Sequence, residues 1–227
     1  MLIHLQDPQR PHLPWVTPTL VLICAGLYLL LSLISPLEHR ELLVHWGSIP
    51  HTLFQALDTA GWSVWLLTLS RLFTALFLHA DALHLLGNLL FLLIFGLPCE
   101  RRLGSLSFLF LFLFGGAMGN LAGALSLPQV MVPVIGCSGA VSAVMGAYLI
   151  LLPRAPLGLI LPLGLYFEFV RLPAALLILL WAMLQWLFSR HGADFGAIVW
   201  WTHLGGFAFG VFYALCMRLA GRQSHAY

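Results

Sequence analysis

The chain has 227 residues, of which 61% are hydrophobic and 8% are charged. Soluble domains carry about 25% charged residues, so this composition excludes an ordinary water-covered surface and indicates a protein coated by lipid. The formal net charge of +2 is too small to suggest a nucleic-acid partner.

Six apolar segments predict an all-α membrane protein, a bundle of six transmembrane helices. In chain order they cover residues 16–35, 73–97, 106–126, 138–152, 172–189 and 201–219. A helix of about 20 apolar residues crosses the hydrocarbon core of a bilayer. We therefore expect a short cytoplasmic segment at 1–15, a membrane domain at 16–219 and a short cytoplasmic tail at 220–227. The polar start lacks the pattern of a signal peptide, so the first span is expected to be retained.

Two connecting segments have an unusual composition. Residues 36–72 mix Trp46, Trp62 and Trp65 with polar side chains, which is typical of a segment that lies at the membrane interface. Residues 157–170 are apolar but are broken by Pro162 and Gly164. We interpret this second piece as interfacial or re-entrant.

The arginines predict the orientation of the bundle, because positive residues concentrate on the cytoplasmic side. With a cytoplasmic N-terminus, seven arginines lie inside and three outside. The inner group is Arg10, Arg101, Arg102, Arg154, Arg171, Arg218 and Arg222, and the outer group is Arg40, Arg71 and Arg190. Both termini are therefore expected in the cytoplasm, and the uncharged loop before Ser138 on the opposite side.

Polar side chains stand at the start of three helices that all enter the membrane from the outer side. His84 and Asn88 open the second span, Ser138 opens the fourth and His203 opens the sixth. Polar groups in lipid are costly and usually face the bundle interior, where they mark function. Each residue taken alone is more often a packing or hydrogen-bonding group, but their common depth indicates a functional site.

Small residues provide a reason for the serine and the histidine to meet. Ser142 and Gly146 follow Ser138, and Gly206 and Gly210 follow His203, at the spacing of one helix face. Small residues at such spacing let membrane helices approach closely. If these two faces pack together, Ser138 and His203 lie at the outer end of the contact.

A serine within hydrogen-bond distance of a histidine forms a nucleophile with its general base. The attacked carbonyl becomes an oxyanion, for which His84, the Asn88 amide and the backbone N–H of Ser138 are candidate donors. Gly136 and Gly139 allow a tight turn around the serine. Since no carboxylate is placed to orient His203, the pattern predicts a Ser–His dyad.

A metal or cofactor is not expected. Cys24, Cys99, Cys137 and Cys216 form no CxxC pair, so neither a zinc site nor a disulfide framework is predicted. Two other classes stay open: a haem or metal protein using His79, His84 and His203, and a small-molecule transporter. The charge-poor interior and the lack of an evident inverted repeat disfavour the transporter.

Four motifs together resemble the rhomboid family of intramembrane serine proteases, in its bacterial six-helix form, over about residues 70–215. They are "HADALHLLGN", "CERRLG", "GCSG" and "WWTHLGGFAFG". The resemblance implies Ser138 as nucleophile, His203 as base and His84 and Asn88 at the oxyanion, with the backbone around Cys137 beside them. It also implies structural roles for Arg71 and for Glu100 and Arg102 of the ExRxG turn. The implied partners are single-pass membrane substrates and the bilayer, the implied location a bacterial cytoplasmic membrane with the site on the non-cytoplasmic side.

The chain departs from the family pattern at several positions. Cys137 and Thr202 stand where alanine is common, Ser70 replaces a tryptophan, and Ser142 replaces an aromatic residue that stacks on the histidine. No proposed catalytic group is lost by these changes. A rhomboid-like pseudoprotease that binds membrane clients is the alternative function, and it is disfavoured because such proteins typically lack the serine or the histidine.

Overall fold

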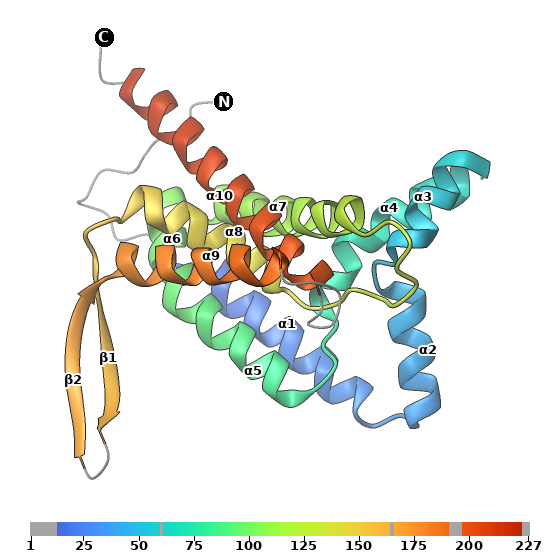
Figure 1. Ribbon diagram of the computed structural model, residues 1–227, viewed down its shortest axis with the longest axis horizontal. Coiled ribbons are helices and arrows are strands. Elements are labelled where there is room, and N and C mark those ends of the chain that lie inside the picture. Colours follow the sequence, from blue (N-terminus) through green and yellow to red (C-terminus); the bar gives the residue numbers. More distant parts are fainter. Residues whose placement is uncertain (1–12, 60, 164–165, 191–196, 224–227) are drawn as a thin grey trace.

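The computed structural model describes residues 13–59, 61–163, 166–190 and 197–223. Helices surround a central core, and one hairpin projects from it (Figure 1). The helices are α1 (Val16–Leu31), α2 (Pro36–Trp46), α3 (Pro50–Thr59), α4 (Trp62–Thr74), η1 (Ala75–Phe77), α5 (Ala82–Phe91), η2 (Leu92–Gly96), α6 (Leu97–Leu103), α7 (Ser105–Ser126), α8 (Ser138–Leu151), α9 (Ala174–Arg190) and α10 (Ala197–Gln223). The strands are β1 (Pro156–Leu163) and β2 (Tyr166–Pro173).

Three helical segments are long and apolar enough to cross a membrane: Ala82–Leu103, Ser105–Ser126 and Val199–Ala220. Four shorter apolar helices accompany them, at Val16–Leu31, Trp62–Phe77, Ser138–Leu151 and Ala174–Arg190. The predicted helical membrane bundle is confirmed, while the count of six spans stays a prediction. Large apolar side chains such as Leu22, Leu86 and Leu179 are exposed on these helices, as lipid-facing residues would be.

The prediction that the second span begins near residue 73 is wrong. The span begins at Ala82, because the carboxylate of Asp81 accepts a hydrogen bond from the backbone N–H of His84 and caps the helix there. Residues 73–77 instead close α4 and form η1. At its other end the span continues to Leu103 through the π-helical turn η2, which ends two residues before Pro98, a residue with no N–H to donate.

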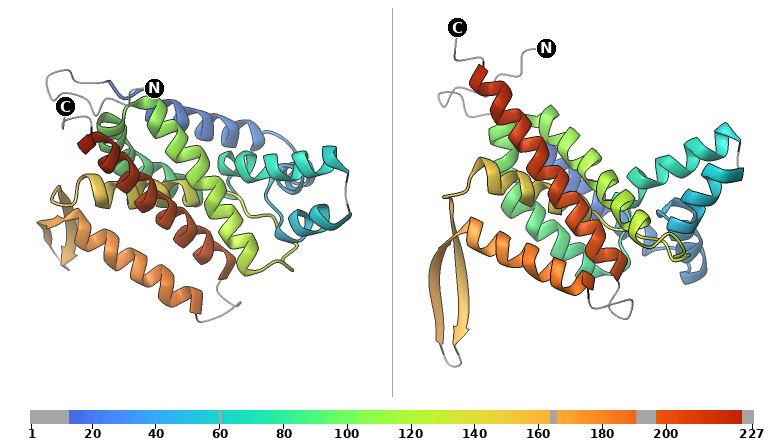
Figure 2. Two further views of the ribbon diagram at one scale, coloured as in Figure 1. Left: turned by 90° about the horizontal axis from the view of Figure 1, so that it is seen from above. Right: turned by 45° about the horizontal axis from the view of Figure 1, so that its top comes forward.

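Helix α8 forms the centre of the bundle. Every residue from Gly139 to Tyr148 is buried, which explains why this short helix shows little amphipathic character. The long helix α10 packs along α8 and α7, and α9 lies beside its first half (Figure 2). The residues that begin α8 therefore lie where several helices meet.

A seam of small residues brings α8 and α10 into backbone contact. A Cβ placed on Gly206 would clash with the carbonyl oxygen of Gly139, and one on Gly210 with that of Ala143. The predicted close approach of the two helices is found, and on α8 Gly139, Ala143 and the predicted Gly146 contact the backbone of α10. Gly119 of α7 joins the seam, since a Cβ there would lie 2.7 Å from the Thr202 carbonyl oxygen.

The expected interfacial or re-entrant piece is an antiparallel β-hairpin. Strands β1 and β2 pair from Pro156 opposite Pro173 to Leu163 opposite Tyr166. The all-helical expectation did not contain this sheet. Short runs rich in leucine, valine and phenylalanine are compatible with either a helix or a strand. The prolines near their ends disfavour a helix. The break expected at Gly164 lies outside the described residues.

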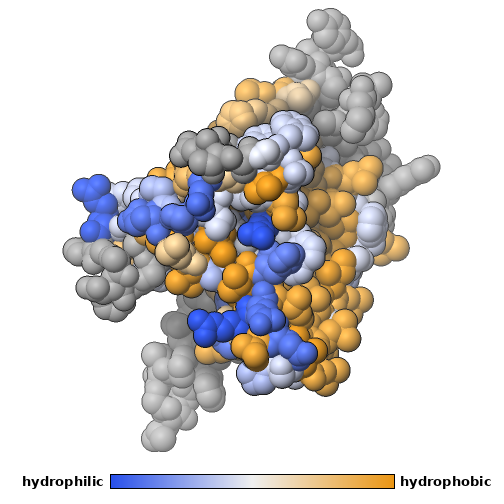
Figure 3. All heavy atoms as spheres, turned by 90° about the vertical axis from the view of Figure 1, so that its right-hand side faces the viewer, coloured by the Kyte–Doolittle hydropathy of each residue, from blue (hydrophilic) through white to orange (hydrophobic). Residues whose placement is uncertain are grey.

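Helices α2, α3 and α4 form a lateral extension of the bundle (Figures 1 and 2). Helix α2 buries none of its residues, and its start is held by a capping box in which Ser35 and Glu38 bond each other's backbone N–H. Hydrogen bonds from the Ser35 hydroxyl and then from the Ser35 backbone N–H to the Glu38 carboxylate lower the pKa of Glu38. Hydrophilic side chains gather on this side of the molecule next to a hydrophobic area, as the predicted interfacial segment requires (Figure 3).

Candidate active site

The loop before Ser138 is held by two other parts of the chain. The N–H of Gly136 donates to the Ala75 carbonyl oxygen at 2.9 Å. Ser48 and Val134 exchange two backbone hydrogen bonds, of 3.1 and 2.8 Å. The α2–α3 connection and η1 thus fix the loop that leads into α8, and with it the position of Ser138.

Gly136 brings this loop against the start of α5. Its φ of +107° lies in the region that only glycine adopts readily. A Cβ at this position would lie 2.6 Å from His84 Cε1 and 3.6 Å from Asn88 Nδ2. Glycine is therefore required both for the turn and for the contact of the loop with the two polar side chains of α5.

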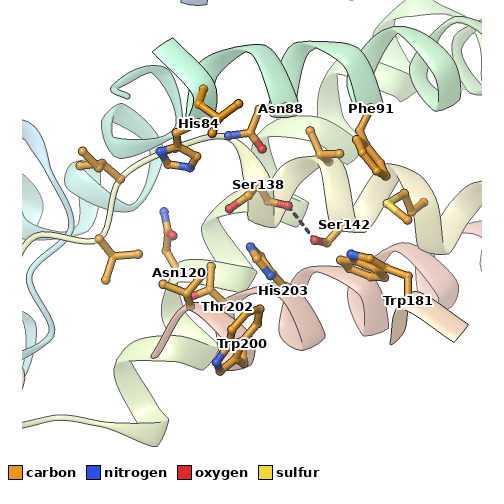
Figure 4. Close-up of a pocket in the computed structure, with 18 residues that line it drawn as sticks. His84, Asn88, Phe91, Asn120, Ser138, Ser142, Trp181, Trp200, Thr202 and His203 are labelled. Carbon is orange, nitrogen blue, oxygen red and sulfur yellow. Dashed lines mark hydrogen bonds between the residues drawn. The ribbon is translucent and has the colours of Figure 1, made fainter. Parts of the chain in front are cut away.

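Of the predicted site residues, His84, Asn88, Gly136, Ser138 and His203 line one pocket of about 390 Å³, and Cys137 is not in its lining. Its polar lining residues come from α5, α7, α8 and α10, and Figure 4 shows them pointing toward a common space. They include His84, Asn88, Asn120, Ser138, Ser142, Thr202 and His203. The convergence predicted for His84, Asn88, Ser138 and His203 is present, and Asn120, Ser142 and Thr202 were not predicted there.

One ring nitrogen of His203 has a hydrogen-bond partner, and the other has none among the described residues. Its Nδ1 atom lies 2.7 Å from the side-chain oxygen of Gln185 on α9. Its Nε2 atom is buried and has no hydrogen-bond partner among the described residues. Ser138 and His203 share the pocket, but the structure shows no hydrogen bond between them, and the Ser142 hydroxyl donates to the Ser138 carbonyl oxygen at 2.7 Å.

Asn88 and His84 are two further polar residues in the lining of the pocket. The amide nitrogen of Asn88 is buried without a partner in the described part of the chain. His84 is half-buried, and its ring meets that of His79 edge-on, with centroids 5.3 Å apart. Burial and the neighbouring imidazole of His84 lower the pKa of His79, which lies in the loop before α5, to about 4. His79 is therefore neutral near pH 7, and its Nε2 contacts the buried thiol of Cys137 at 3.6 Å.

The residues expected to have structural roles differ in their surroundings. The Glu100 carboxylate accepts hydrogen bonds from the backbone N–H groups of Trp15, Val16 and Thr17 and from the Ser105 hydroxyl. Arg102 is exposed, and no hydrogen bond of its side chain is found within the described ranges. The Nε of Arg71 is buried without a partner there.

Helix α9 contributes to the site in a way that the sequence did not predict. Gln185 contacts the histidine, and the ring of Trp181, one helical turn earlier, lies 6.1 Å from that of His203. Trp200 approaches the same imidazole edge-on. A single amide in an otherwise apolar helix was the available signal for Gln185.

No group of three or more His, Cys, Asp or Glu side chains in the described residues is arranged to hold a metal ion. The four cysteines are free thiols.

Fold and site together define a helical membrane protein in which a serine and a histidine line one pocket. The family model of the Rhomboid domain matches residues 66–220, and the chain belongs to the rhomboid family. The predicted resemblance is thereby confirmed.

Curated relatives match over a shorter stretch. The chain is 37% identical over 79 residues to "RHOMBOID-like protein 6, mitochondrial" of Arabidopsis thaliana, which covers 35% of this chain and 25% of the relative. It is 38% identical over 79 residues to YdcA of Bacillus subtilis (strain 168), described as a candidate rhomboid protease, over 35% of this chain and 39% of that one. It is 38% identical over 76 residues to "Rhomboid-like protease 3" of Toxoplasma gondii, over 34% and 28% of the two chains. The matches therefore span well under half of each relative.

Proposed function

We propose that the protein is an intramembrane serine endopeptidase that hydrolyses peptide bonds in or near the transmembrane segments of other membrane proteins. The observation that carries this function is the buried, unpartnered Nε2 of His203 in the pocket that also holds Ser138. A buried nitrogen without a partner is costly, and a serine hydroxyl that turns toward it would satisfy it. Membership of the rhomboid family supports the same chemistry.

The reaction assigns each group a task. Nε2 of His203 takes the proton of the Ser138 hydroxyl as its oxygen attacks the peptide carbonyl carbon. The tetrahedral oxyanion accepts hydrogen bonds from the Asn88 amide, from His84 and from the backbone at Cys137 and Ser138. The imidazolium then gives its proton to the leaving amine, the C–N bond breaks, and water hydrolyses the resulting acyl-enzyme by the same route in reverse.

The substrate class follows from the depth of the site. Ser138 begins α8, so a membrane helix would be cut near one end and not at its centre. Helical peptide carbonyls are bonded to the N–H four residues ahead, so the cut requires local unwinding, and small or helix-breaking residues near it should help. The arginine distribution supports a location of this end on the non-cytoplasmic side, which in a bacterium is the outer side of the cytoplasmic membrane.

Labelling with a fluorophosphonate probe tests the proposed nucleophile. The purified protein should be labelled on Ser138, as located by mass spectrometry, and Ser138→Ala should abolish the label. His203→Ala should slow labelling steeply because base and nucleophile act as a unit. Ser142→Ala, one turn along α8 in the same pocket, is the matched control and should keep the label on Ser138.

Proteolysis of a membrane substrate separates the protease from the pseudoprotease. Cleavage by the wild type that is absent in Ser138→Ala is expected. A wild type that binds membrane segments but neither cleaves them nor takes the label would favour a client-binding protein.

A further inference from the structure

Gln185 is the polar side chain of α9 that contacts His203. Every other residue from Ala174 to Phe188 is alanine, leucine, isoleucine, methionine, tryptophan or phenylalanine. The side chain is 7% exposed, so its amide is nearly removed from solvent. An amide buried in a membrane helix is costly unless it is bonded, and it usually serves a function or a helix–helix contact.

The contact of Gln185 determines which nitrogen of His203 carries the proton. The amide oxygen of Gln185 can only accept, and it lies 2.7 Å from Nδ1. Nδ1 therefore bears the hydrogen, and the lone pair of the neutral ring is on Nε2. That is the tautomer a base needs at the atom that faces the pocket.

The same contact restricts the orientation of the ring. Rotation of the imidazole about its Cβ–Cγ bond would move Nδ1 away from Gln185 and leave a buried donor unpaired. The Trp181 ring, at the same face of α9, lies 6.1 Å from the imidazole at a tilt of 37°. Helix α9 thus contacts His203 through a hydrogen bond and an aromatic ring.

Carboxylates do not perform this task within the described residues. The Nδ1 atom of His203 is bonded to Gln185, and its Nε2 atom has no partner among the described residues. Neither ring nitrogen therefore contacts a carboxylate there. Asp81 caps α5 and Glu100 binds the start of α1. The absence of a carboxylate at the histidine, expected from the sequence, therefore does not leave the ring unsupported.

We propose that Gln185 is a positioning residue that orients His203 and holds it in the base-competent tautomer, so that Ser138, His203 and Gln185 act as a triad with a neutral third member. This inference rests on the serine-protease function proposed above. An amide oxygen can hold a histidine as a carboxylate does, and it strengthens its bond when the ring becomes an imidazolium during the reaction. The expected Ser–His dyad is thereby extended by a residue from a third helix.

Substitution of Gln185 by methionine and by glutamate distinguishes the effect of the acceptor oxygen from the effect of side-chain volume. Gln185→Met keeps the length of the side chain and removes the oxygen, so it should slow probe labelling of Ser138 and lower kcat by about 10²-fold, the lower end of what general acid–base catalysis supplies. KM should stay unchanged, because the substrate does not bind Gln185. Gln185→Glu retains an acceptor and should restore most of the rate. Ser189→Ala is the matched control one turn along α9, where the hydroxyl bonds the helix's own Trp186 carbonyl, and should keep the wild-type rate.

The outcomes distinguish the two levels of inference. Labelling of Gln185→Met at the wild-type rate, with loss in His203→Ala, would overturn the triad and leave the protease in place. Equal losses in Gln185→Met and Gln185→Glu, or losses that follow a lowered thermal midpoint, would also overturn it in favour of a packing role. A wild type that takes no label would overturn the protease itself.

Nitrogen NMR of isotopically labelled histidine tests the tautomer without any reaction. The resonances that disappear in His203→Ala should show a protonated Nδ1 and an unprotonated Nε2 at neutral pH, and Gln185→Met should change this ratio. A wild-type His203 protonated at Nε2 would contradict the inference whatever the activity.

Discussion

At the scale of single residues, the pocket combines groups that are bonded with groups that are left free. His203 has one bonded and one unpartnered nitrogen, and the Asn88 amide nitrogen is buried without a partner in the described chain. Asn120 of the same pocket instead donates its amide to the Leu72 carbonyl oxygen at 2.9 Å. A buried donor without a partner costs stability, and at this pocket we propose that the Asn88 amide is left free to bind the oxyanion.

Alanine substitution of the free donors should slow the reaction without unfolding the protein. Loss of one oxyanion donor costs roughly 10²–10³ in rate in other enzymes, and less where donors share the charge. We expect Asn88→Ala and His84→Ala to lower kcat on a membrane substrate in detergent while the thermal midpoint stays near wild type. Asn120→Ala is the control of the same residue type, and should lower stability because a buried carbonyl loses its partner. Wild-type turnover in both Asn88→Ala and His84→Ala would exclude the oxyanion role.

At the scale of elements, close backbone contact between α8 and α10 decides where the serine and histidine lie. Gly206 and Gly210 face carbonyl oxygens of α8 at distances that leave no room for a side chain. A one-residue change on this seam therefore moves two helices, whereas the same change on a lipid-facing helix surface moves nothing.

The seam predicts opposite effects for two glycine substitutions. Gly210→Ala should destabilise the protein by about 1–3 kcal/mol, the usual effect of overpacking, because its Cβ meets the Ala143 carbonyl oxygen. Gly26→Ala in α1 has nothing within 4 Å of the added Cβ, and helix propensity should make it neutral or stabilising by up to about 1 kcal/mol. Thermal unfolding in one detergent compares the two. Equal midpoints for both variants would show that the seam is not tight.

A second element-scale contact holds α1 to the bundle. The first N–H groups of α1 lack partners within the helix, and the buried Glu100 carboxylate accepts three of them, from Trp15, Val16 and Thr17. The cap is thus supplied from a residue more than 80 positions away in the chain.

Removal of this cap should loosen α1. Hydrogen bonds to a charged group contribute about 1.5–3 kcal/mol each, so Glu100→Ala should lower the thermal midpoint strongly and expose the start of α1 to proteolysis. Glu38→Ala removes a capping carboxylate of the same type at the exposed start of α2 and should change the midpoint little. A Glu100→Ala variant as stable as Glu38→Ala would mean that α1 is held by its apolar contacts alone.

At the scale of the whole molecule, Arg218 and Ser138 lie at opposite ends of α8. The Arg218 guanidinium of α10 donates to the Ile150 carbonyl oxygen at the end of α8, so the last turns of both helices lie at one level. Ser138 begins α8 at the opposite end of that helix. With Arg218 at one end and the pocket at the other, the predicted orientation would place the pocket on the non-cytoplasmic side, and it stays a prediction.

Reporter fusions check that orientation. A fusion at Gln129, in the loop before Ser138, should be active only for a reporter that works on the non-cytoplasmic side, and one at Arg101 only for a cytoplasmic reporter. The reverse pattern would place the pocket toward the cytoplasm, and substrates would then be cut at their cytoplasmic end. Mass spectrometry of cleavage products provides an independent readout.

The sequence by itself determined the class of protein, because 61% hydrophobic residues in long runs can be covered only by lipid and because helices are marked by their length and composition. It also predicted the pocket residues that stand at helix starts, Ser138, His203, His84 and Asn88, since their depth follows from their position in each span. Only the tertiary structure decided the start of the second span, where Asp81 caps the helix, and the hairpin at β1 and β2, since short apolar runs fit either a helix or a strand. The contact of Gln185 with His203 was also decided only by the tertiary structure. Residue spacing along one helix cannot show which side chain of a second helix it contacts. The contacts between helices set those features, and such contacts depend on packing across the bundle rather than on neighbours in the chain.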